Sequence, residues 1–189
     1  LKISPQNTDG SNSYDDIRSK FQSCINSLIA RQCNLNSTLK MAVNYLIDEA
    51  LNNISEHSLA HRGFVFAQYY PSLQCLHVAI ADPGITILGS YQRTGRTDIS
   101  SSFEAINHAL EGVSTKTDGG RGFGIRTSRR MLVEGLGGSY LLYSGDAFNV
   151  RTSDKNEVVI SPIALPGTYL LFKIPIMADQ TFDFYGYVE

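Results

Sequence analysis

The first sixty residues carry two stretches in which apolar positions recur at helical spacing. Between Tyr14 and Cys33 the apolar positions predict a helix, and they are Ile17, Phe21, Ile25, Leu28 and Ile29. A second helix is predicted over about 38–55, with Ser37 as its N-cap. Its apolar positions again follow a 3.6-residue period: Val43, Leu46, Ile47, Ala50, Leu51 and Ile54.

After His61 the pattern changes to that of strands. The segments "RGFVFAQYY" and "LQCLHVAIAD" flank "PSL", which predicts a hairpin whose second strand is buried and ends at Asp82. Residues 83–97 contain glycines and basic residues, and we expect a loop there with little regular structure. A short helix is predicted over about 101–111, because Ser101 and Glu104 fit a capping box and Gly112 follows.

The last third is polar at first and then rich in strand patterns. The stretch "VSTKTDGGRGFGI" precedes a predicted helix that runs to about Glu134, and four strands are expected after it: "SYLLYS", "AFNVR", "EVVIS" and "TYLLFKI". This order predicts an α+β fold, a two-layer sandwich with helices on one face of a mixed β-sheet. We expect an N-terminal linker and leading helix over 1–36 and one domain over 37–189. The apolar stripe of the leading helix could pack into this core or dock on a second copy.

Composition narrows the function classes without naming one. The 189 residues are 42% hydrophobic, enough for one core, and the formal charge of −2 does not favour nucleic acid or anionic membranes as partners. No apolar run approaches about 18 residues, so no membrane span is expected in this chain. Three cysteines cannot all pair, which favours a reducing, cytoplasmic setting. The chain starts at Leu1, which suggests a piece of a longer protein.

Polar chemistry is concentrated on the second predicted helix, in "YLIDEALNNISEHS". Glu49 and Asn53 are four residues apart and therefore share one helix face beside apolar neighbours. A carboxamide beside a carboxylate suits a hydrated Mg²⁺, which takes only one or two protein oxygens. A solvated helix face is the alternative interpretation.

A second candidate group lies in "VAIADPGITI". The buried strand brings Asp82 to its carboxyl end, and Gly84 follows at the turn. A fixed carboxylate there can accept a hydrogen bond from an exocyclic amine such as adenine N6, whereas the carbonyl of guanine would be repelled. An ordinary Asp–Pro–Gly turn is the simpler alternative.

A third group is the glycine run "GGRGFGI". Gly120, Gly122 and Gly124 alternate just before a predicted helix, so their backbone N–H groups could form a nest for phosphate oxygens. Between Tyr91 and Arg130 seven basic and four acidic residues give a local charge of +3. Lys116 and Arg121 flank the glycines and are the candidates for phosphate contact.

Taken in chain order, these three groups resemble the motifs of the GHKL ATPase superfamily, which includes histidine kinases, anti-sigma-factor kinases, gyrase and MutL-type proteins. The resemblance covers about residues 38–176. "EALNNISEHS" is similar to the N-box, "VAIADPGITI" to the first glycine box and "GGRGFGI" to the second. "GLGGSYLLYS" and "PGTYLLFKIPI" are similar to the closing strands.

The resemblance implies an ATP- and Mg²⁺-binding domain, with roles for individual residues. Asn53 would ligate Mg²⁺, and Glu49 would orient or deprotonate the attacking group. Asp82 would recognise adenine, with room for the base at Gly84 and with Thr168 nearby. The phosphate-binding stretch would comprise Lys116, Gly120, Arg121, Gly122, Phe123 and Gly124. Residues 89–121 would form a mobile lid, and His57 matches a frequent N-box histidine.

Two departures from the family pattern bear on function. Thr86 stands where the first glycine box usually has a second glycine, so the backbone there must differ from the family's. Apart from Gly112, which ends the preceding predicted helix, the lid also has no glycine shortly before "TKTDGGRGFGI" that would extend it into a long glycine-rich loop.

The sequence therefore predicts an ATPase or a kinase acting on a partner protein in signalling. A nucleotide-dependent switch that does not catalyse, or a degenerate interaction domain, is the alternative. A partner protein, a fused domain or a homodimer is compatible with each.

Overall fold

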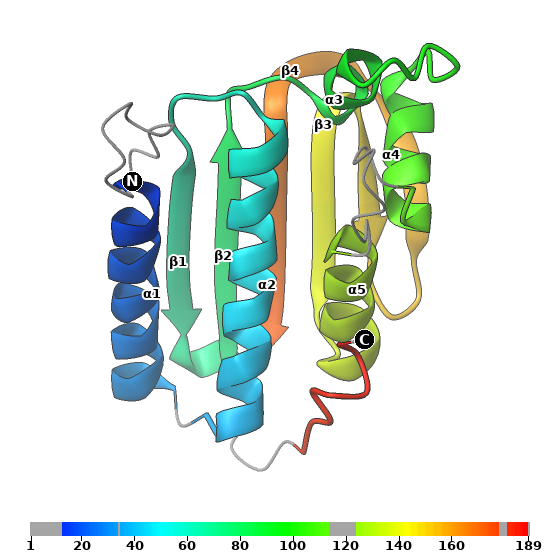
Figure 1. The fold of residues 1–189 in the computed structure, drawn as a ribbon. Helices are drawn as coiled ribbons and strands as arrows, with labels where there is room; N and C mark the ends of the chain where they lie inside the picture. The colour runs from blue at the N-terminus through cyan, green and yellow to red at the C-terminus, as the bar shows by residue number, and fades with distance from the viewer. Residues whose placement is uncertain (1–12, 34, 114–123, 178–180, 189) are drawn as a thin grey trace.

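The protein is described by a computed structural model that covers residues 13–33, 35–113, 124–177 and 181–188. These residues form an α+β fold in which helices lie on one side of a four-stranded sheet, as the sequence predicts (Figure 1). The predicted first helix is α1 (Ser13–Gln32), and the second is α2 (Ser37–His57). The predicted hairpin comprises β1 (Phe64–Tyr70) and β2 (Cys75–Asp82), joined through the 3₁₀ turn Pro71–Leu73.

The sheet is antiparallel throughout its described strands, and not mixed as expected. Its order is β1-β2-β4-β3, with β3 spanning Ser139–Arg151 and β4 spanning Asn156–Pro175. After its hairpin with β3, β4 enters the sheet between β2 and β3 and runs opposite to both. The expectation of four short closing strands is also wrong, because a bulge around Gly145 lets β3 continue without a turn.

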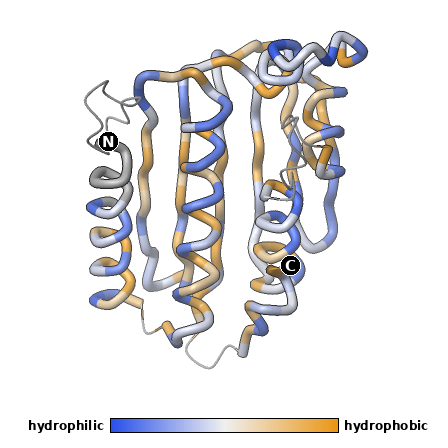
Figure 2. The backbone as a smooth tube through the Cα atoms, viewed as in Figure 1, coloured by the Kyte–Doolittle hydropathy of each residue, from blue (hydrophilic) through white to orange (hydrophobic). Residues whose placement is uncertain are grey.

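Three rows of apolar side chains on the covered face of the sheet form the floor of the core. Leu76 and Ile174 form the first row, Val78, Phe172 and Tyr140 form the second, and Ile80, Leu170 and Leu142 form the third. The helix α2 packs over these rows with eight buried residues, which include all six that the periodicity indicates: Leu39, Ala42, Val43, Leu46, Ile47, Ala50, Leu51 and Ile54. Its hydrophobic and hydrophilic positions alternate along the helix in Figure 2. Burial of this stripe holds α2 on the sheet.

The leading helix belongs to the same core. Ile25 and Ile29 on α1 are buried in one cluster with α2 and the sheet, and Ile29 is 0% exposed. Core packing thus accounts for this part of the apolar stripe that the sequence assigns either to the core or to a second copy. The side chains of residues 13–18 and of Phe21 lie outside the description.

The segment 83–97 is not the loop that its composition indicates, because it contains the helix α3 (Ile87–Arg93). Thr86 is its N-cap, with an extended backbone, and its Oγ1 accepts a hydrogen bond from the N–H of Gly89 at 3.1 Å. Ser144 Oγ on β3 accepts from the N–H of Ile87 at 2.9 Å. This second contact crosses from another strand, so no local pattern could reveal it.

The other helices begin and end close to their predicted positions. Asn36 caps α2 instead of Ser37, because its side chain accepts from the N–H of Leu39 at 2.9 Å. The helix α4 (Ser102–Glu111) has Ser101 as its cap and ends at Gly112 in the left-handed conformation, as expected. The last helix begins as α5 (Gly124–Arg130) and continues as a π-helical turn, η2 (Met131–Gly135).

Two findings bear on the surroundings of the protein. Within the described residues, no helix combines the length and apolar character that crossing a membrane requires. All three cysteines are free thiols, with Cys24 exposed and Cys33 and Cys75 buried.

The place of α1 in the core can be tested by truncating Ile29. We expect Ile29→Ala to lower the free energy of unfolding by about 2–5 kcal/mol, since it leaves a cavity in the core. Ser23→Ala, at an exposed position of the same helix, should change it by less than about 0.5 kcal/mol. Urea denaturation measures both, and equal effects would show that α1 does not pack as described.

Candidate functional site

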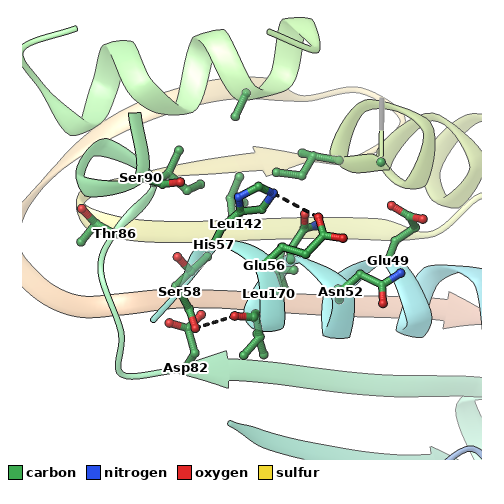
Figure 3. A pocket seen from close by; sticks show the side chains of 18 of the residues that line it. Glu49, Asn52, Glu56, His57, Ser58, Asp82, Thr86, Ser90, Leu142 and Leu170 are labelled. Carbon is green, nitrogen blue, oxygen red and sulfur yellow. Dashed lines mark hydrogen bonds and ion pairs between the residues drawn. The ribbon is translucent and has the colours of Figure 1, made fainter. Parts of the chain in front are cut away.

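A cavity of about 220 Å³ opens on the helix side of the sheet, beside the end of β2 (Figure 3). Residues of α2, α3, α4, α5, β2, β3 and β4 line it. Six of the residues that the sequence singles out lie together in its wall: Glu49, Asn53, Asp82, Thr86, Gly124 and Thr168. They come from four segments that are far apart in the chain.

The floor of the cavity is a polar row at the end of the apolar ladder. The register places Asp82 on β2 opposite Thr168 on β4, and Thr168 opposite Ser144 on β3. Ser144 Oγ lies 3.2 Å from Thr168 Oγ1 and donates to the carbonyl of Gly167 at 3.1 Å. One hydroxyl therefore joins β3 to β4 beside Asp82 and, through Ile87, holds the start of α3.

Asp82 is the buried carboxylate of the site, at 3% exposure. Its Oδ1 accepts a hydrogen bond from the N–H of Gly84 at 2.9 Å, and the N–H of Thr168 also donates to this side chain. Burial disfavours the charged form and raises the pKa of Asp82 to about 6, although these two backbone donors act to lower it. The carboxyl group is therefore mostly ionised at neutral pH, although little of it is accessible to solvent.

Two glycines let the backbone close tightly around Asp82. A Cβ on Gly84 would lie 2.0 Å from the carbonyl oxygen of Ser58, so Gly84 serves the packing of this turn against the end of α2. It does not line the cavity, and the space for a base that the resemblance implies at Gly84 is not found at that position. Gly167 has a φ of +73°, and a Cβ there would lie 1.8 Å from the carbonyl oxygen of Asp82.

The opposite wall is the polar face of α2. Glu49 and Asn53 lie here as predicted, together with Asn52, Glu56 and His57. His57 Nε2 lies 3.6 Å from a carboxylate oxygen of Glu56, a contact drawn in Figure 3. Both side chains are partly exposed, so this pair adds little to stability.

Glu49 contacts the start of the helix α5. A Cβ on Gly124 would lie 2.0 Å from Glu49 Oε2, so only glycine allows this approach. Burial, together with the negative charge of Glu49, raises the pKa of Tyr45 to about 12, while a hydrogen bond with Thr127 acts to lower it. The two helices therefore meet through polar contacts at the predicted catalytic carboxylate.

The helix α3 supplies a wall that the sequence did not reveal. Ser90 and Tyr91 line the cavity and are buried, and Tyr91 packs with Ile99, Ala105 and Ala109 in a second apolar cluster. The phenol of Tyr91 donates to the carbonyl of Val113. Burial raises the pKa of this phenol to about 12, so Tyr91 acts as a donor and as an apolar wall.

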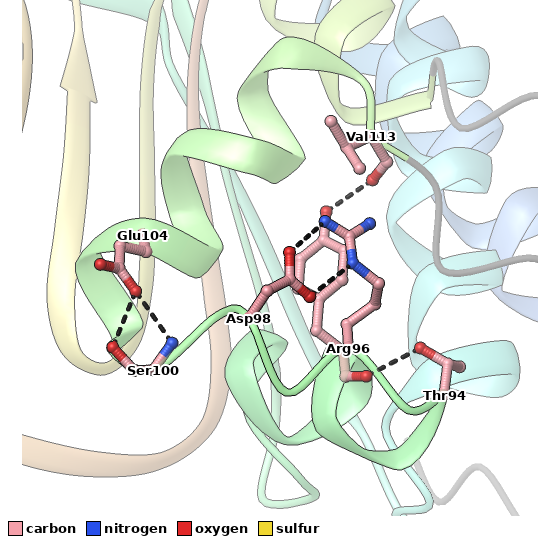
Figure 4. A network of polar contacts seen from close by, with 7 residues as sticks. Thr94, Arg96, Asp98, Ser100, Glu104 and Val113 are labelled. Carbon is pink, nitrogen blue, oxygen red and sulfur yellow. Dashed lines mark hydrogen bonds and ion pairs between the residues drawn. The ribbon is translucent and has the colours of Figure 1, made fainter.

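Exposed polar contacts brace the segment between α3 and α4 (Figure 4). Arg96 forms a bidentate pair with Asp98, with both N–O distances at 2.9 Å, and its guanidinium lies 6.0 Å from the centre of the Tyr91 ring. Glu104 accepts from the N–H and the hydroxyl of Ser100 at 2.8 and 3.0 Å. The Arg96 guanidinium borders Tyr91, whereas the Ser100–Glu104 contacts lie at the start of α4, and none of these residues except Tyr91 lines the cavity.

Part of the predicted phosphate-binding stretch lies outside the described residues, namely Lys116, Gly120, Arg121, Gly122 and Phe123. Of the other basic residues there, Arg129 donates to Asn156 at 3.0 Å, and Arg130 pairs with Glu134 at 3.7 Å. Neither lines the cavity.

The side chains of the cavity that could ligate a cation offer mainly oxygen atoms. Among the described residues, no group of three or more His, Cys, Asp and Glu side chains could hold a metal ion. Glu49 and Asn53 could supply one or two oxygens to a hydrated cation. Ser90, Tyr91, Ser144 and Gly167 were missed by the sequence analysis. Of these, only Gly167 carried a local signal, in the dipeptide Pro–Gly.

Comparison with protein-family models finds no match for this chain, and comparison with the curated proteins finds none either.

Two substitutions separate the steric requirement for glycine at position 167 from the requirement for a positive φ. We expect Gly95→Ala to cost about 1 kcal/mol, since Gly95 has a φ of +85° but open space around its Cα. Gly167→Ala adds a steric clash with Asp82 and should cost about 1–3 kcal/mol more. Chemical denaturation measures both variants. Equal losses would mean that the turn around Asp82 is looser than described.

The raised pKa of Asp82 predicts a pH-dependent penalty on folding. Between pH 4 and pH 7 the unfolded chain loses this proton more readily than the native state, so ionisation favours the unfolded chain. We expect the stability of Asp82→Asn, which does not titrate, to rise relative to that of the parent by roughly 2–2.5 kcal/mol between pH 4 and pH 7. Urea denaturation at both pH values tests this. A constant difference would contradict the raised pKa.

Proposed function

We propose that this chain is a Mg-ATP-binding domain of the GHKL type. The observation that carries the proposal is the convergence of Asp82, Asn53, Glu49 and Thr168 on one cavity. The sequence boxes that resemble the GHKL motifs are separated by up to 119 residues, from Glu49 to Thr168. Chance similarity of separate segments would not be expected to bring their key residues into one wall.

The base-binding end of the proposed site is Asp82. A carboxylate has about four lone-pair positions, and backbone N–H groups of Gly84 and Thr168 occupy two of them. The remaining capacity suits an amine donor such as adenine N6. A guanine carbonyl would face this acceptor without a hydrogen bond, at a cost of about 1–3 kcal/mol. The site therefore fits adenine better than guanine.

The phosphate end is assigned to the polar face of α2. Asn53 is one turn beyond Glu49 along this face, and both line the same cavity as Asp82. Bound Mg²⁺ would neutralise phosphate charge there. Asn53 would hold the cation through its amide oxygen, and Glu49 would accept a proton from the attacking water or hydroxyl.

The reaction that fits this arrangement is transfer of the γ-phosphoryl group to a partner protein, or slow hydrolysis in regulation. Phosphoryl transfer depends mainly on positioning and charge neutralisation, so it needs no further nucleophile on this chain. Thr86 is compatible with binding, because it is an extended N-cap and does not occupy a position of positive φ.

Nucleotide binding can be tested by the thermal shift of the protein with Mg-ATP. At a ligand concentration 100-fold above Kd, we expect the melting temperature to rise by roughly 5–10 °C. Asp82→Asn should weaken ATP binding roughly 10- to 100-fold, since it exchanges an acceptor for a donor facing the amine. Asp154→Asn is the matched control, as this exposed residue lies in the β3–β4 turn. No shift at millimolar ATP would contradict the proposal.

The catalytic assignment has its own measurement. Glu49→Gln should keep the thermal shift but lower phosphoryl transfer or hydrolysis at least roughly 100-fold, because it removes the base. An unchanged rate would remove Glu49 from the mechanism. A parent that binds ATP without measurable turnover would instead favour the nucleotide-dependent switch.

A further inference from the structure

The two faces of the sheet differ in how they are covered. Helices lie on one face in Figure 1, and no described helix covers the other, which we call the outer face. Its side chains follow from the strand register, because neighbours along a strand point to opposite sides. One outer row runs Phe64, Ala81, Tyr169 and Tyr143, and the next runs Phe66, Ala79, Leu171 and Leu141.

This face is apolar where solvent would favour polar residues. An antiparallel sheet with one open side usually alternates between apolar and polar positions. Here Phe64, Phe66 and Leu171 point outward and are 54%, 60% and 46% exposed. Contiguous exposed apolar surface of this kind marks an interaction site.

The shape of the outer face is a trough between two ridges. The small side chains of Ala79 and Ala81 on β2 lie between the phenylalanines of β1 and the large residues of β4. Neighbouring strands lie about 4.8 Å apart, so the two ridges stand roughly 10 Å from each other. A ridge of similar width can therefore pack into the trough.

Charge is sparse on this surface and confined to one end. A third row contains Gln68, His77, Lys173 and Ser139, and Lys173 is the ionised residue of the three rows. A surface without a strong positive electrostatic potential does not favour binding to nucleic acid or to an anionic lipid surface. The two apolar rows carry no charge that would repel a copy of this chain, and Lys173 lies in the third row at the end of the face, from which its long side chain can reach solvent.

We propose that two copies of this chain pack together through the outer face. A two-fold axis parallel to the strands, between β2 and β4, places β2 of each copy over β4 of the other and β1 over β3. Leu171 then enters the Ala79 trough of the second copy, and Phe66 packs on Leu141 of the second copy. Each contact occurs twice, as an isologous interface requires.

The available area is sufficient for such a dimer. A face four strands wide and eight residues long measures roughly 19 by 27 Å, or about 500 Å² per copy before side-chain relief is counted. Two copies bury about 1,000 Å² in this flat approximation, which is at the lower limit for a specific interface, and side-chain relief adds to this area. Sheets packed face to face in this way keep their strands within about 30° of each other.

The dimer does not depend on the proposed nucleotide site, which opens on the helix side of the sheet. The cavity is lined from α2, α3, α4 and α5 and remains accessible when the outer face is covered. Loss of the dimer and loss of ATP binding can therefore be observed separately.

Sedimentation equilibrium of the parent should give twice the chain mass of 20.8 kDa. We expect Leu171→Asp and Phe66→Asp each to raise the dimer dissociation constant roughly 100-fold, because they bury unpaired charge at the interface. Leu73→Asp is the matched control, since Leu73 is 63% exposed but lies in the turn between β1 and β2. Its mass should stay that of a dimer. Thermal melts verify that the variants fold.

A charge-pair experiment tests the arrangement itself. Ala79→Lys should also be monomeric alone, but mixing it with Leu171→Asp places the two new charges opposite each other and should restore the dimer mass. A monomeric parent at micromolar to millimolar concentration would overturn the proposal and point to a different occupant of this face. A dimer insensitive to Leu171→Asp, or a mixture that stays monomeric, would overturn it as well.

Discussion

Asp82, Thr168 and Ser144 lie in one row because β4 pairs with β2 on one side and with β3 on the other. Three apolar rows precede this polar row, so the ladder that builds the core also builds the cavity floor. A slip of one residue in any of the three strands would turn its polar residue to the outer face. The burial of α2 against the apolar rows opposes such a slip, and core packing therefore defines the geometry of the site.

Much of the fold could be predicted because its signals are local. The buried stripe of α2 and the cap at Ser101 follow from spacing within a few residues, and both agree with the structure. The helix α3 and the continuous strand β3 could not be predicted in this way. The start of α3 depends on a hydrogen bond that the N–H of Ile87 donates to Ser144 on another strand, and the continuity of β3 depends on a bulge at Gly145, a residue whose sequence context predicts a break between strands.

The residues of the candidate site also differ in whether a local sequence signal identifies them. Glu49 and Asn53 could be found from helical spacing, and Asp82 from its position at the end of a buried run. Ser144 and Gly167 could not, because their contacts with β2, β4 and α3 exist only after the sheet forms. Gly84 shows a different limit. Its sequence context indicates space for a ligand, whereas the space at its Cα is filled by the Ser58 carbonyl.

The pleat of β2 places residues of the cavity and residues of the outer face next to each other in the chain. Asp82 faces the cavity, while Ala81, the residue before it, faces the trough on the other side. On β4 the same holds for Thr168 and Tyr169. The same peptide units therefore shape the cavity floor and the outline of the opposite surface, so the strand pairing that fixes one surface also fixes the other.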